Sequence, residues 1–429
     1  MKKFKVALVG AGGRGKQYTD EMLKLPEQFE VVSVAEPIEE RRETIKRLHN
    51  LDEKNCYTTW EDLLNSPKIA DVAIISTLDR MHYEPTIKAI EQGYHLLLEK
   101  PVTPLPHECM TIAKKAKENN VKIMVCHVLR YAPFYVNLKK LLNDGIVGDV
   151  VSIIHMEGVG NTHQSHSFVR GNWGNSEASS PMLLQKCCHD LDILQWLIDK
   201  KCKKIQSFGS LKYFTEENAP EGAPDYCYKG CPKADECFYN AQKLYLTDEM
   251  LDWFKCAVVG TNELPSNEQI EEALKTSPYG RCVFKCDNDV VDHQVVNMEF
   301  EDDVTISFTM NAFNKGGRNI RIMGTKGELV GSDDKESVTV YDFATRKERE
   351  ITFGKDTVDA SIANGHGGGD EGIVRALYAY LTDECSAEDV SEIGISCKNH
   401  MMVFAAEKSR HEGVVVDMDE FIKTIENEI

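Results

Sequence analysis

The feature that most constrains the fold is a glycine-rich turn between an apolar run and a helical pattern near the start of the chain. Residues 10–15 read Gly-Ala-Gly-Gly-Arg-Gly and directly follow the apolar run Phe4–Val9. In such a strand–turn–helix unit, the first glycine permits a tight turn, the second lets a pyrophosphate approach the backbone, and the third lets the helix pack close to the strand. The turn therefore predicts a dinucleotide site that includes Gly10, Gly12, Gly13, Arg14 and Gly15.

An acidic residue at the end of the second predicted strand refines this prediction. The run Phe29–Ala35 is followed by Glu36, 21 residues after Gly15. A carboxylate at this place binds both ribose hydroxyls of NAD and repels the 2′-phosphate of NADP. We therefore expect NAD as the cofactor, with NADP as the less favoured alternative. A glycine turn in some other α/β protein is the competing interpretation.

Composition narrows the class of protein. The chain has 429 residues, of which 42% are hydrophobic and 28% charged, as in a soluble globular protein of two or three domains. A net charge of −19 argues against nucleic acid or an anionic membrane as a partner. No membrane-spanning run and no signal peptide is expected. Fourteen cysteines without a secretion signal indicate a reducing compartment, so we expect a cytoplasmic protein.

The chain divides into two patterns. Up to about residue 128, strands alternate with single helices, which predicts βαβ units and a doubly wound parallel sheet. Beyond that point, strand-like runs such as 304–310 alternate apolar and polar residues, as in an antiparallel sheet with one covered face. The fold class is therefore α/β, with domains 1–128 and 129–429. A segment rich in Cys, Pro and charge, at about 215–288, is interpreted as an insertion into the second domain.

Lys100 is the first candidate for catalysis. It follows the predicted strand His95–Leu98, and ligands bind outside the carboxyl ends of strands in open α/β sheets. A lysine there can donate a hydrogen bond to a substrate oxygen and stabilise alkoxide character. A solvated lysine in a turn is the alternative. Residues at this and the neighbouring strand end are also predicted to line the nicotinamide side of the cofactor: Ser76, Thr77, His82, Glu99 and Lys100.

His189 is the second candidate. It lies with Asp192 in the apolar helical stretch Met182–Ile198, and a spacing of three residues puts both on one helix face. An imidazole beside a carboxylate is suited to general acid/base catalysis. A buried histidine with a structural role is the alternative.

Together these elements resemble those of a known family. They occur in the order Gly10–Gly15, Glu36-Pro37, Glu99-Lys100-Pro101, His189-x-x-Asp192-x-x-x-Trp196 and Met323–Leu329. The chain resembles the glucose–fructose oxidoreductase/inositol dehydrogenase/MocA family over almost its whole length apart from the insertion. The resemblance implies an N-terminal Rossmann domain and a C-terminal α/β domain with an open, mainly antiparallel sheet, often used to form homodimers or homotetramers. It also implies hydride transfer between nicotinamide and a sugar or cyclitol carbon, with Lys100 as the catalytic lysine and His189 as the general acid/base.

One position departs from the family pattern. Many members carry aspartate four residues before this histidine, where the present chain has Gln185 followed by Lys186. Glutamine can bind a hydroxyl group but does not accept a proton usefully. Lys186 is expected to take part in catalysis, to bind substrate or to face solvent.

Further substrate candidates are polar or aromatic residues outside the regular elements. The irregular segment 161–173 offers hydrogen-bonding and stacking groups suited to a sugar, and an ordinary surface loop is its alternative. Arg130 follows the last strand of the first domain, and His366 opens a late helix next to three glycines that could equally form a hinge or a cap. The predicted substrate residues are Arg130, His163, His166, Arg170, Trp173, Gln185, Lys186 and His366.

The insertion contains a cluster of cysteines. Cys227, Cys231, Cys237 and Cys282 could supply four thiolates to a structural zinc ion. An iron–sulfur cluster would accept the same ligands. The third interpretation is a set of reduced cysteines that pack a small satellite core.

Three functions remain compatible with the sequence. The first is an NAD-dependent dehydrogenase acting on a secondary hydroxyl of a sugar, sugar derivative or cyclitol. The second is an enzyme that cleaves glycosides by transient oxidation and elimination, which relatives in the family perform. The third is a non-enzymatic NAD-binding regulatory protein.

Overall fold

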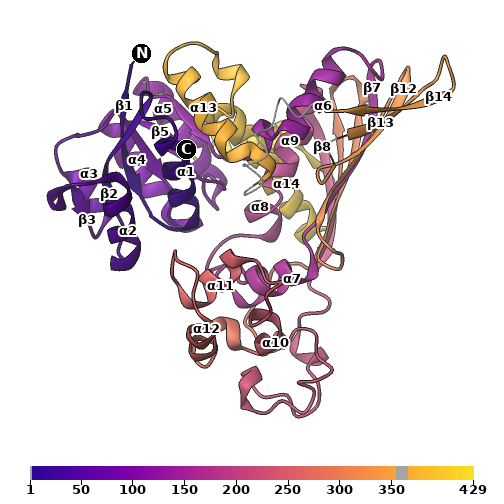
Figure 1. Cartoon of the computed structure of the whole chain (residues 1–429). Helices are drawn as coiled ribbons and strands as arrows, with labels where there is room; N and C mark the ends of the chain where they lie inside the picture. The colour runs from indigo at the N-terminus through magenta and orange to yellow at the C-terminus, as the bar shows by residue number, and fades with distance from the viewer. Residues whose placement is uncertain (1, 336, 354–365) are drawn as a thin grey trace.

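Two β-sheets organise the chain, and a group of short helices lies below them (Figure 1). The computed structural model describes residues 2–335, 337–353 and 366–429. The first sheet has the strand order β3-β2-β1-β4-β5-β6, and all its pairs are parallel. This order confirms the predicted doubly wound sheet. Its strands are β1 (Phe4–Val9), β2 (Phe29–Ala35), β3 (Cys56–Tyr57), β4 (Val72–Ile75), β5 (His95–Leu98) and β6 (Ile123–Val125).

Helices cover both faces of the first sheet because successive residues of its buried strands point to opposite sides. Val6 and Leu8 of β1 pack with helices α1, α2 and α13, whereas Ala7 and Val9 pack with α3, α4 and α5. The bounds are α1 (Gly13–Leu23), α2 (Glu39–His49), α3 (Trp60–Asn65), α4 (Tyr83–Glu91), α5 (Pro106–Glu118) and α13 (Gly369–Leu381). Helix α13 comes from late in the sequence and completes one layer of the first sheet. The packing of the first sheet therefore includes residues from both sides of the boundary predicted after residue 128. That domain boundary remains a prediction.

The second sheet is mainly antiparallel, as expected, with β7 and β10 as its parallel pair. Its order is β14-β13-β12-β11-β7-β10-β9-β8-β15. Along β10, Ile306, Phe308 and Met310 are buried while the residues between them are not. The strands are β7 (Val150–Gly158), β8 (Cys202–Ser210), β9 (His293–Phe300), β10 (Thr305–Asn311), β11 (Gly317–Gly324), β12 (Gly327–Ser332), β13 (Ser337–Asp342), β14 (Lys347–Thr352) and β15 (Val416–Asp417). The sequence also predicts a strand over Glu336–Tyr341, and its first residue, Glu336, lies outside the described residues.

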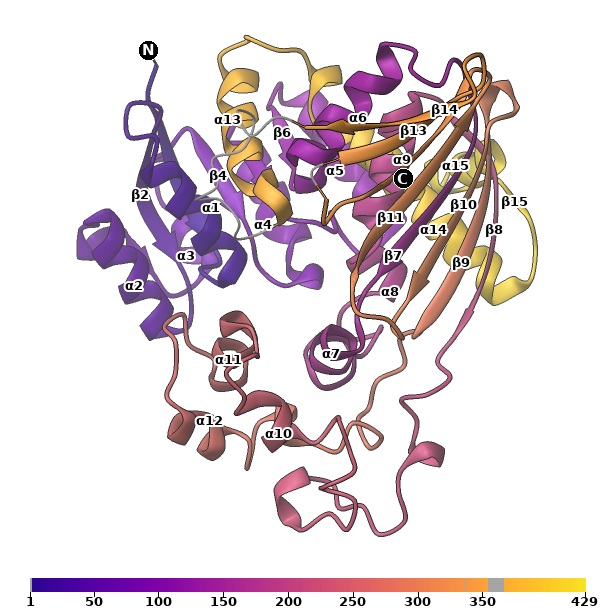
Figure 2. The ribbon, with the colours of Figure 1, turned by 45° about the vertical axis from the view of Figure 1, so that its right-hand side comes forward.

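Helices cover one face of the second sheet and leave the other open (Figure 2). The covering helices share one continuous apolar core with the first sheet, and α14 packs against α5 and α9 as well as β8. They are α6 (Pro133–Asn143), α8 (Met182–Gln185), α9 (Cys188–Ile198), α14 (Ile393–Glu412) and α15 (Met418–Glu426). Within the described residues, no helix combines the length and apolar character needed to cross a membrane.

The segment between β8 and β9 forms the group of short helices below the sheets. Its helices are α10 (Ala241–Tyr245), α11 (Asp252–Val259) and α12 (Asn267–Ala273). A small core of its own, with Tyr245, Phe254 and Ile270 fully or almost fully buried, holds them together. We call residues 215–288 the insertion, and its exact limits remain those predicted from the sequence.

Candidate active site

The glycine turn, residues 10–15, has the shape that its sequence predicts. Gly10 has φ +88°, and a Cβ there would lie 2.6 Å from the carbonyl oxygen of Ser76. A Cβ on Gly15 would lie 2.1 Å from the carbonyl oxygen of Gly10, so only glycine lets α1 approach β1 this closely. In contrast, a Cβ on Gly13 would meet no atom within 4 Å. The turn is thus closed on the side of the sheet and open at the start of α1.

Two side chains fix the backbone of this turn. The Ser76 hydroxyl donates to the carbonyl oxygen of Gly10 at 2.7 Å. The carboxylate of Glu36, buried at the end of β2, accepts from the backbone N–H groups of Ala11 at 2.7 Å and Ile38 at 3.0 Å. Glu36 therefore lies beside the glycine turn, at the strand end where the sequence predicts a ribose contact.

Arg14 points toward the end of β5. Its Nε donates to Glu99 at 2.9 Å and its Nη2 to Asp370 at 2.5 Å. Glu99 also accepts from Tyr18 and, at 2.8 Å, from the backbone N–H of Lys100. Burial acts to raise the pKa of Glu99, but the charges of Arg14 and Lys100 outweigh it and lower that pKa. Arg14 thus stabilises the strand end that carries Lys100.

The ammonium group of Lys100 meets the helix that carries His189. Its Nζ donates to the main-chain carbonyl of Gln185 at 2.6 Å. The predicted helix Met182–Ile198 is broken at this point into α8 and α9, which leaves that carbonyl at a helix end, where an outside donor can reach it. Lys100 also acts electrostatically on Cys188, the neighbour of His189. Lys100, at the end of β5 in the first sheet, therefore contacts the α8–α9 segment that carries His189 under the second sheet.

His189 stands at one end of a row of three buried histidines. Its ring meets that of His127 edge-on, with centroids 5.8 Å apart, and His127 meets His400 at 5.5 Å. Burial lowers the pKa of His127 to about 4. Asp192, which the sequence groups with His189, accepts two hydrogen bonds from Arg130, at 2.6 and 2.7 Å. Arg130 is thus buried in an ion pair and not presented to a ligand.

The side chain of Gln185 is engaged away from Lys100. Its Nε2 donates to the carbonyl oxygen of Trp173 at 2.8 Å, and its Oε1 accepts from Ser179 at 3.3 Å. Trp173 in turn donates from Nε1 to Asp79, which follows β4, at 3.4 Å. These contacts tie the segment before α8 to the first sheet. The backbone of Gln185, and not its amide, faces Lys100.

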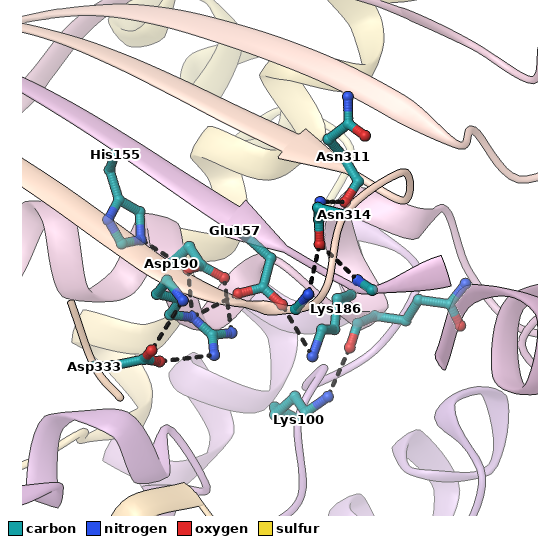
Figure 3. Close-up of polar contacts among 12 residues, drawn as sticks. Lys100, His155, Glu157, Lys186, Asp190, Asn311, Asn314 and Asp333 are labelled. Atoms are coloured by element: carbon teal, nitrogen blue, oxygen red, sulfur yellow. Dashed lines mark hydrogen bonds and ion pairs between the residues drawn. The ribbon is translucent and has the colours of Figure 1, made fainter. Parts of the chain in front are cut away.

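Lys186 enters a charged network under the second sheet (Figure 3). Its Nζ pairs with Glu157 of β7 at 3.1 Å, and Glu157 pairs with Arg318 of β11 at 2.7 Å. Arg318 also binds Asp190 at 2.8 Å, and Asp190 accepts from His155 at 2.9 Å. Burial acts to raise the pKa of Asp190, but Arg318 and His155 lower it overall. Only 19% of the Lys186 side chain is exposed, so it is not a solvent-facing lysine.

The residues of the predicted substrate segment 161–173 fall into two groups: one lies near the two lysines, and the other is buried against the insertion. It contains a short turn, α7 (Asn161–His163), and a π-helix over Gln164–Arg170. His163 is partly exposed and lies near Lys186 and Lys100, whose charges join burial in lowering its pKa. His166 and Arg170 are buried and bind the insertion: His166 bonds Tyr245 at 2.9 Å, and Arg170 bonds the carbonyl of Tyr239 at 2.6 Å.

The remaining predicted residues lie around the strand ends of the first sheet. His82 is buried, with its ring nitrogens 2.7 Å from the carbonyl oxygen of Pro101 and 3.1 Å from that of Thr77. The Thr77 hydroxyl donates to the carbonyl of Met81 at 2.9 Å. His366 begins a 3-10 turn before α13, and its side chain lies outside the described part of the chain.

The four cysteines predicted as zinc ligands line one small cavity of the insertion, together with apolar side chains such as Phe284. In the described parts of the chain, however, no three His, Cys, Asp or Glu side chains are arranged to hold a metal ion. The zinc prediction thus receives no support. Cys282 is buried, and Cys231, Cys237 and Cys286 pack against the same apolar cluster. This packing is compatible with the third interpretation, a small satellite core that contains reduced cysteines.

Two residues that the sequence analysis does not single out approach this site from the insertion. Trp253 of α11 contacts the ring of His163, with centroids 5.4 Å apart. Asn262 donates from Nδ2 to the carbonyl of Ala11, in the glycine turn, at 3.2 Å. No local sequence pattern marks either residue, because the tertiary fold of the 74-residue insertion decides which of its side chains lie near the site.

Comparison with known proteins covers both halves of the chain. Residues 4–127 match the model of an oxidoreductase family with an NAD-binding Rossmann fold, GFO_IDH_MocA, and residues 139–428 match the C-terminal alpha/beta domain of the same family. The inositol 2-dehydrogenase/D-chiro-inositol 3-dehydrogenase of Lactiplantibacillus plantarum is 24% identical over 278 residues, or 63% of this chain and 74% of that protein.

Two further proteins bear on function and on fold. The 2,7-anhydro-N-acetylneuraminate hydratase of Mediterraneibacter gnavus is 29% identical over 210 residues, or 49% of this chain and 53% of that protein. A solved levoglucosan dehydrogenase, in complex with NADH and levoglucosan, is similar over 97% of this chain and 100% of its own, with a TM-score of 0.70 and 17% identity. At that identity, the structural likeness shows the fold alone.

Proposed function

The chain belongs to the Gfo/Idh/MocA family of NAD-binding oxidoreductases, and on this premise we propose that it is an NAD-dependent dehydrogenase acting on a secondary hydroxyl of a sugar, sugar derivative or cyclitol. The observation that carries the proposal is the contact of Lys100 with the carbonyl of Gln185, four residues before His189. In this proposal, Lys100 as hydrogen-bond donor and His189 as acid/base candidate act on the same substrate at the carboxyl end of β5. The inositol dehydrogenase among the relatives supports the substrate class.

The residues at the glycine turn fit a dinucleotide. No side chain caps the N-terminus of α1, and no acidic residue lies in its first turn, so its N–H groups are suited to a pyrophosphate. Gly12 and Gly13 provide the close approach, and Glu36 is placed for the ribose hydroxyls of NAD. Ser76, Thr77 and His82 shape the strand end beside Lys100. Bound NAD supplies a nicotinamide ring that accepts hydride from carbon.

Lys100 and His189 divide the work at the substrate hydroxyl. A lysine ammonium has three N–H donors, so Lys100 keeps two for the substrate oxygen while the third binds the Gln185 carbonyl. Its positive charge stabilises the alkoxide character that develops as hydride leaves. A ring nitrogen of His189 takes the hydroxyl proton. Lys186, which follows Gln185, and His163, whose pKa the charges of Lys186 and Lys100 help to lower, are proposed to bind further hydroxyl groups.

A second candidate uses the same residues without net oxidation. Transient oxidation makes a neighbouring C–H bond acidic, elimination then breaks a bond to oxygen, and the reaction ends with NAD in its starting form. The hydratase among the relatives favours this candidate, because hydration changes no net oxidation state. Gln185 also agrees with it, since the side chain supplies no carboxylate for a proton relay. The third reading, a non-enzymatic NAD-binding protein, is not favoured by relatives named as enzymes.

Assembly and location form part of the same proposal. The open face of the second sheet exposes Ile154 of β7 and Phe208 of β8, which supports pairing with a second copy of the chain into a dimer or tetramer. All 14 cysteines are free thiols, which supports a reducing compartment such as the cytoplasm. A small carbohydrate or cyclitol is the expected partner, and neither nucleic acid nor a membrane is expected.

The test combines a substrate panel with one substitution. Sugars, glycosides and inositols are incubated with NAD, while NADH absorbance and product chromatography are followed together. NADH formed with an oxidised product supports a dehydrogenase, and product without NADH supports the second candidate. Lys100→Met is expected to lower kcat on the order of 10³-fold and to leave the NADH Kd nearly unchanged. Unchanged turnover would remove Lys100 from its assigned role.

A further inference from the structure

Helix α11 of the insertion spans the distance between the predicted substrate site and the predicted cofactor site. Figures 1 and 2 show it between α2 and α7. With eight residues it is about 12 Å long. Its first turn carries Trp253, beside His163, and the residues after its last turn reach the glycine turn. The helix therefore has one end at each half of the site.

The contacts at the cofactor end are polar and specific. Asn262 donates to the carbonyl of Ala11, the residue whose N–H binds Glu36. Glu40, in the first turn of α2, accepts from the hydroxyl of Thr261 at 3.3 Å and from the backbone N–H of Asn262 at 3.4 Å. The turn after α11 thus lies over the strand end where Glu36 is placed for a ribose.

At the first turn of α11, the packing leaves one large aromatic ring, that of Trp253, partly exposed beside the predicted substrate site. Phe254 is 3% exposed and packs into the core of the insertion, whereas Trp253, its neighbour, is 47% exposed. The Trp253 ring meets those of His163 and His166 edge-on at 5.4 and 5.5 Å. His163 lies within the electrostatic reach of Lys100 and Lys186. A half-exposed indole in contact with His163 offers an apolar face on the side of the site where Lys100 and Lys186 act electrostatically.

The position of α11 is fixed by the π-helix Gln164–Arg170. The His166 ring stacks on Tyr279 at 4.5 Å and contacts Phe254 at 4.2 Å. Arg170 donates to the carbonyl oxygens of Arg281 at 2.8 Å and Tyr239 at 2.6 Å. His166 and Arg170, which the sequence analysis assigns to substrate, therefore hold the insertion to the second domain. A rigid support of this kind is what a specific site needs.

We propose that α11 forms the roof of the active site, with Trp253 as the specificity-determining residue on which the ring of a sugar or cyclitol stacks and Asn262 as the residue that fastens the roof to the glycine turn. The proposal rests on the proposed function. Polyhydroxylated rings offer apolar C–H faces between their hydroxyl groups, and an exposed indole matches such a face. The insertion then selects cyclic substrates, and it slows exchange of the dinucleotide.

Substrate specificity is tested with three variants on myo-inositol, D-glucose and methyl β-D-glucoside. For whichever of them the native protein converts, Trp253→Ala is expected to raise KM about tenfold or more, with kcat changed less than about threefold. Trp253→Phe, which keeps an aromatic face, is expected to recover most of that loss. Phe238→Ala removes another exposed aromatic ring of the insertion, 67% exposed, and is the matched control with an unchanged KM.

The cofactor end is tested without any sugar. Asn262→Ala is expected to increase the dissociation rate of NADH, followed by its fluorescence, by about fivefold or more, whereas Phe238→Ala leaves it unchanged. Conversion by the native protein with an unaltered KM in Trp253→Ala refutes the role of Trp253 and leaves the proposed function intact. Absence of both conversion and binding across the panel refutes the proposed function and the stacking role with it. An unchanged NADH dissociation rate refutes the fastening role of Asn262.

Discussion

Arg130 and Asp192 form a buried, two-point ion pair between the turn after β6 and helix α9, with Nε–Oδ2 and Nη2–Oδ1 distances of 2.6 and 2.7 Å. Asn399 of α14 donates to the same carboxylate. Burial acts to raise the pKa of Asp192, but the guanidinium of Arg130 outweighs it and lowers that pKa. The carboxylate three residues after His189 is therefore neutralised by an arginine, and the pair holds the helix that presents His189.

Replacing Arg130 is expected to destabilise the fold. Arg130→Met leaves the buried carboxylate of Asp192 without its counter-charge, which costs about 3–5 kcal/mol of unfolding free energy. Urea unfolding followed by circular dichroism measures the change. The double variant Arg130→Met/Asp192→Leu removes both charges and is expected to recover most of the loss. Equal instability of the single and double variants would contradict this account of the pair.

The contact between Lys100 and Gln185 is made by the backbone, so it is expected to survive a change of side chain. Gln185→Ala keeps the carbonyl that binds Lys100 and should change kcat less than about fivefold. It removes the hydrogen bonds to Trp173 and Ser179, which lowers the unfolding free energy by about 1–3 kcal/mol. Steady-state kinetics and thermal unfolding are measured on the same sample. A loss of kcat as large as that of Lys100→Met would instead give the amide a catalytic role.

Two glycines of the turn are expected to respond differently to the same change. Gly10→Ala forces a side chain into a left-handed conformation, 2.6 Å from the Ser76 oxygen, and should lower Tm and abolish NADH binding. Gly13→Ala meets open space and should leave Tm unchanged or slightly raised. Its NADH affinity should fall, since the added methyl group stands where a pyrophosphate is proposed. Differential scanning fluorimetry with and without NADH separates the effect on stability from the effect on binding. An equal loss of Tm in the Gly10→Ala and Gly13→Ala variants would contradict the open space beside Gly13.

Acid is expected to destabilise the protein through buried histidines. Burial lowers the pKa of His127 to about 4 and the pKa values of His166 and His400 to about 3, compared with about 6.5 in an unfolded chain. The unfolded state therefore binds more protons between these values. The stability contributed by the neutral rings is complete above about pH 6.5 and is lost as the pH falls toward 4 and 3, by up to about 1.4 kcal/mol per pH unit for each ring.

The measurement is Tm at several pH values between about 7 and 5. The double variant His166→Phe/Tyr245→Phe removes one buried titrating ring together with its hydrogen-bond partner and should flatten the decline. His107→Gln changes an exposed histidine and should follow the native curve. A double variant whose Tm declines as steeply as the native protein would contradict the assignment to His166.

Local patterns predict the regular parts of the fold well. The strands Phe4–Val9 and His95–Leu98 have the bounds expected from the sequence. The break between α8 and α9 could not be predicted, because Met182–Ile198 contains neither glycine nor proline to interrupt a helix. The break coincides with a tertiary contact, the bond from Lys100 to Gln185, which no local pattern reveals. Strand β12 and helix α15 were also absent from the predicted elements.

The type of a residue indicates which chemistry its side chain can perform, but not whether the side chain faces a ligand or other protein groups. Arg130, His166 and Arg170 have side chains suited to a polar substrate, and each is buried against protein groups instead. Only the packing of distant segments decides this, since their partners lie 62 to 111 residues away along the chain. Lys100 and His189 were easier to place, because a strand end and a helix face fix where such side chains point.

The late position of α13 in the sequence has a consequence for biosynthesis. Leu377 and Ile373 of this helix cover the same side of the first sheet as α1, and Asp370 binds Arg14 of the glycine turn. A ribosome that has released the first 128 residues has therefore made every strand of that sheet but not the helix that completes its surface. The apolar side of the first sheet that α13 covers therefore stays exposed in the nascent chain until some 250 further residues have emerged. The first sheet therefore obtains its complete apolar layer only when residues near the end of the chain are present.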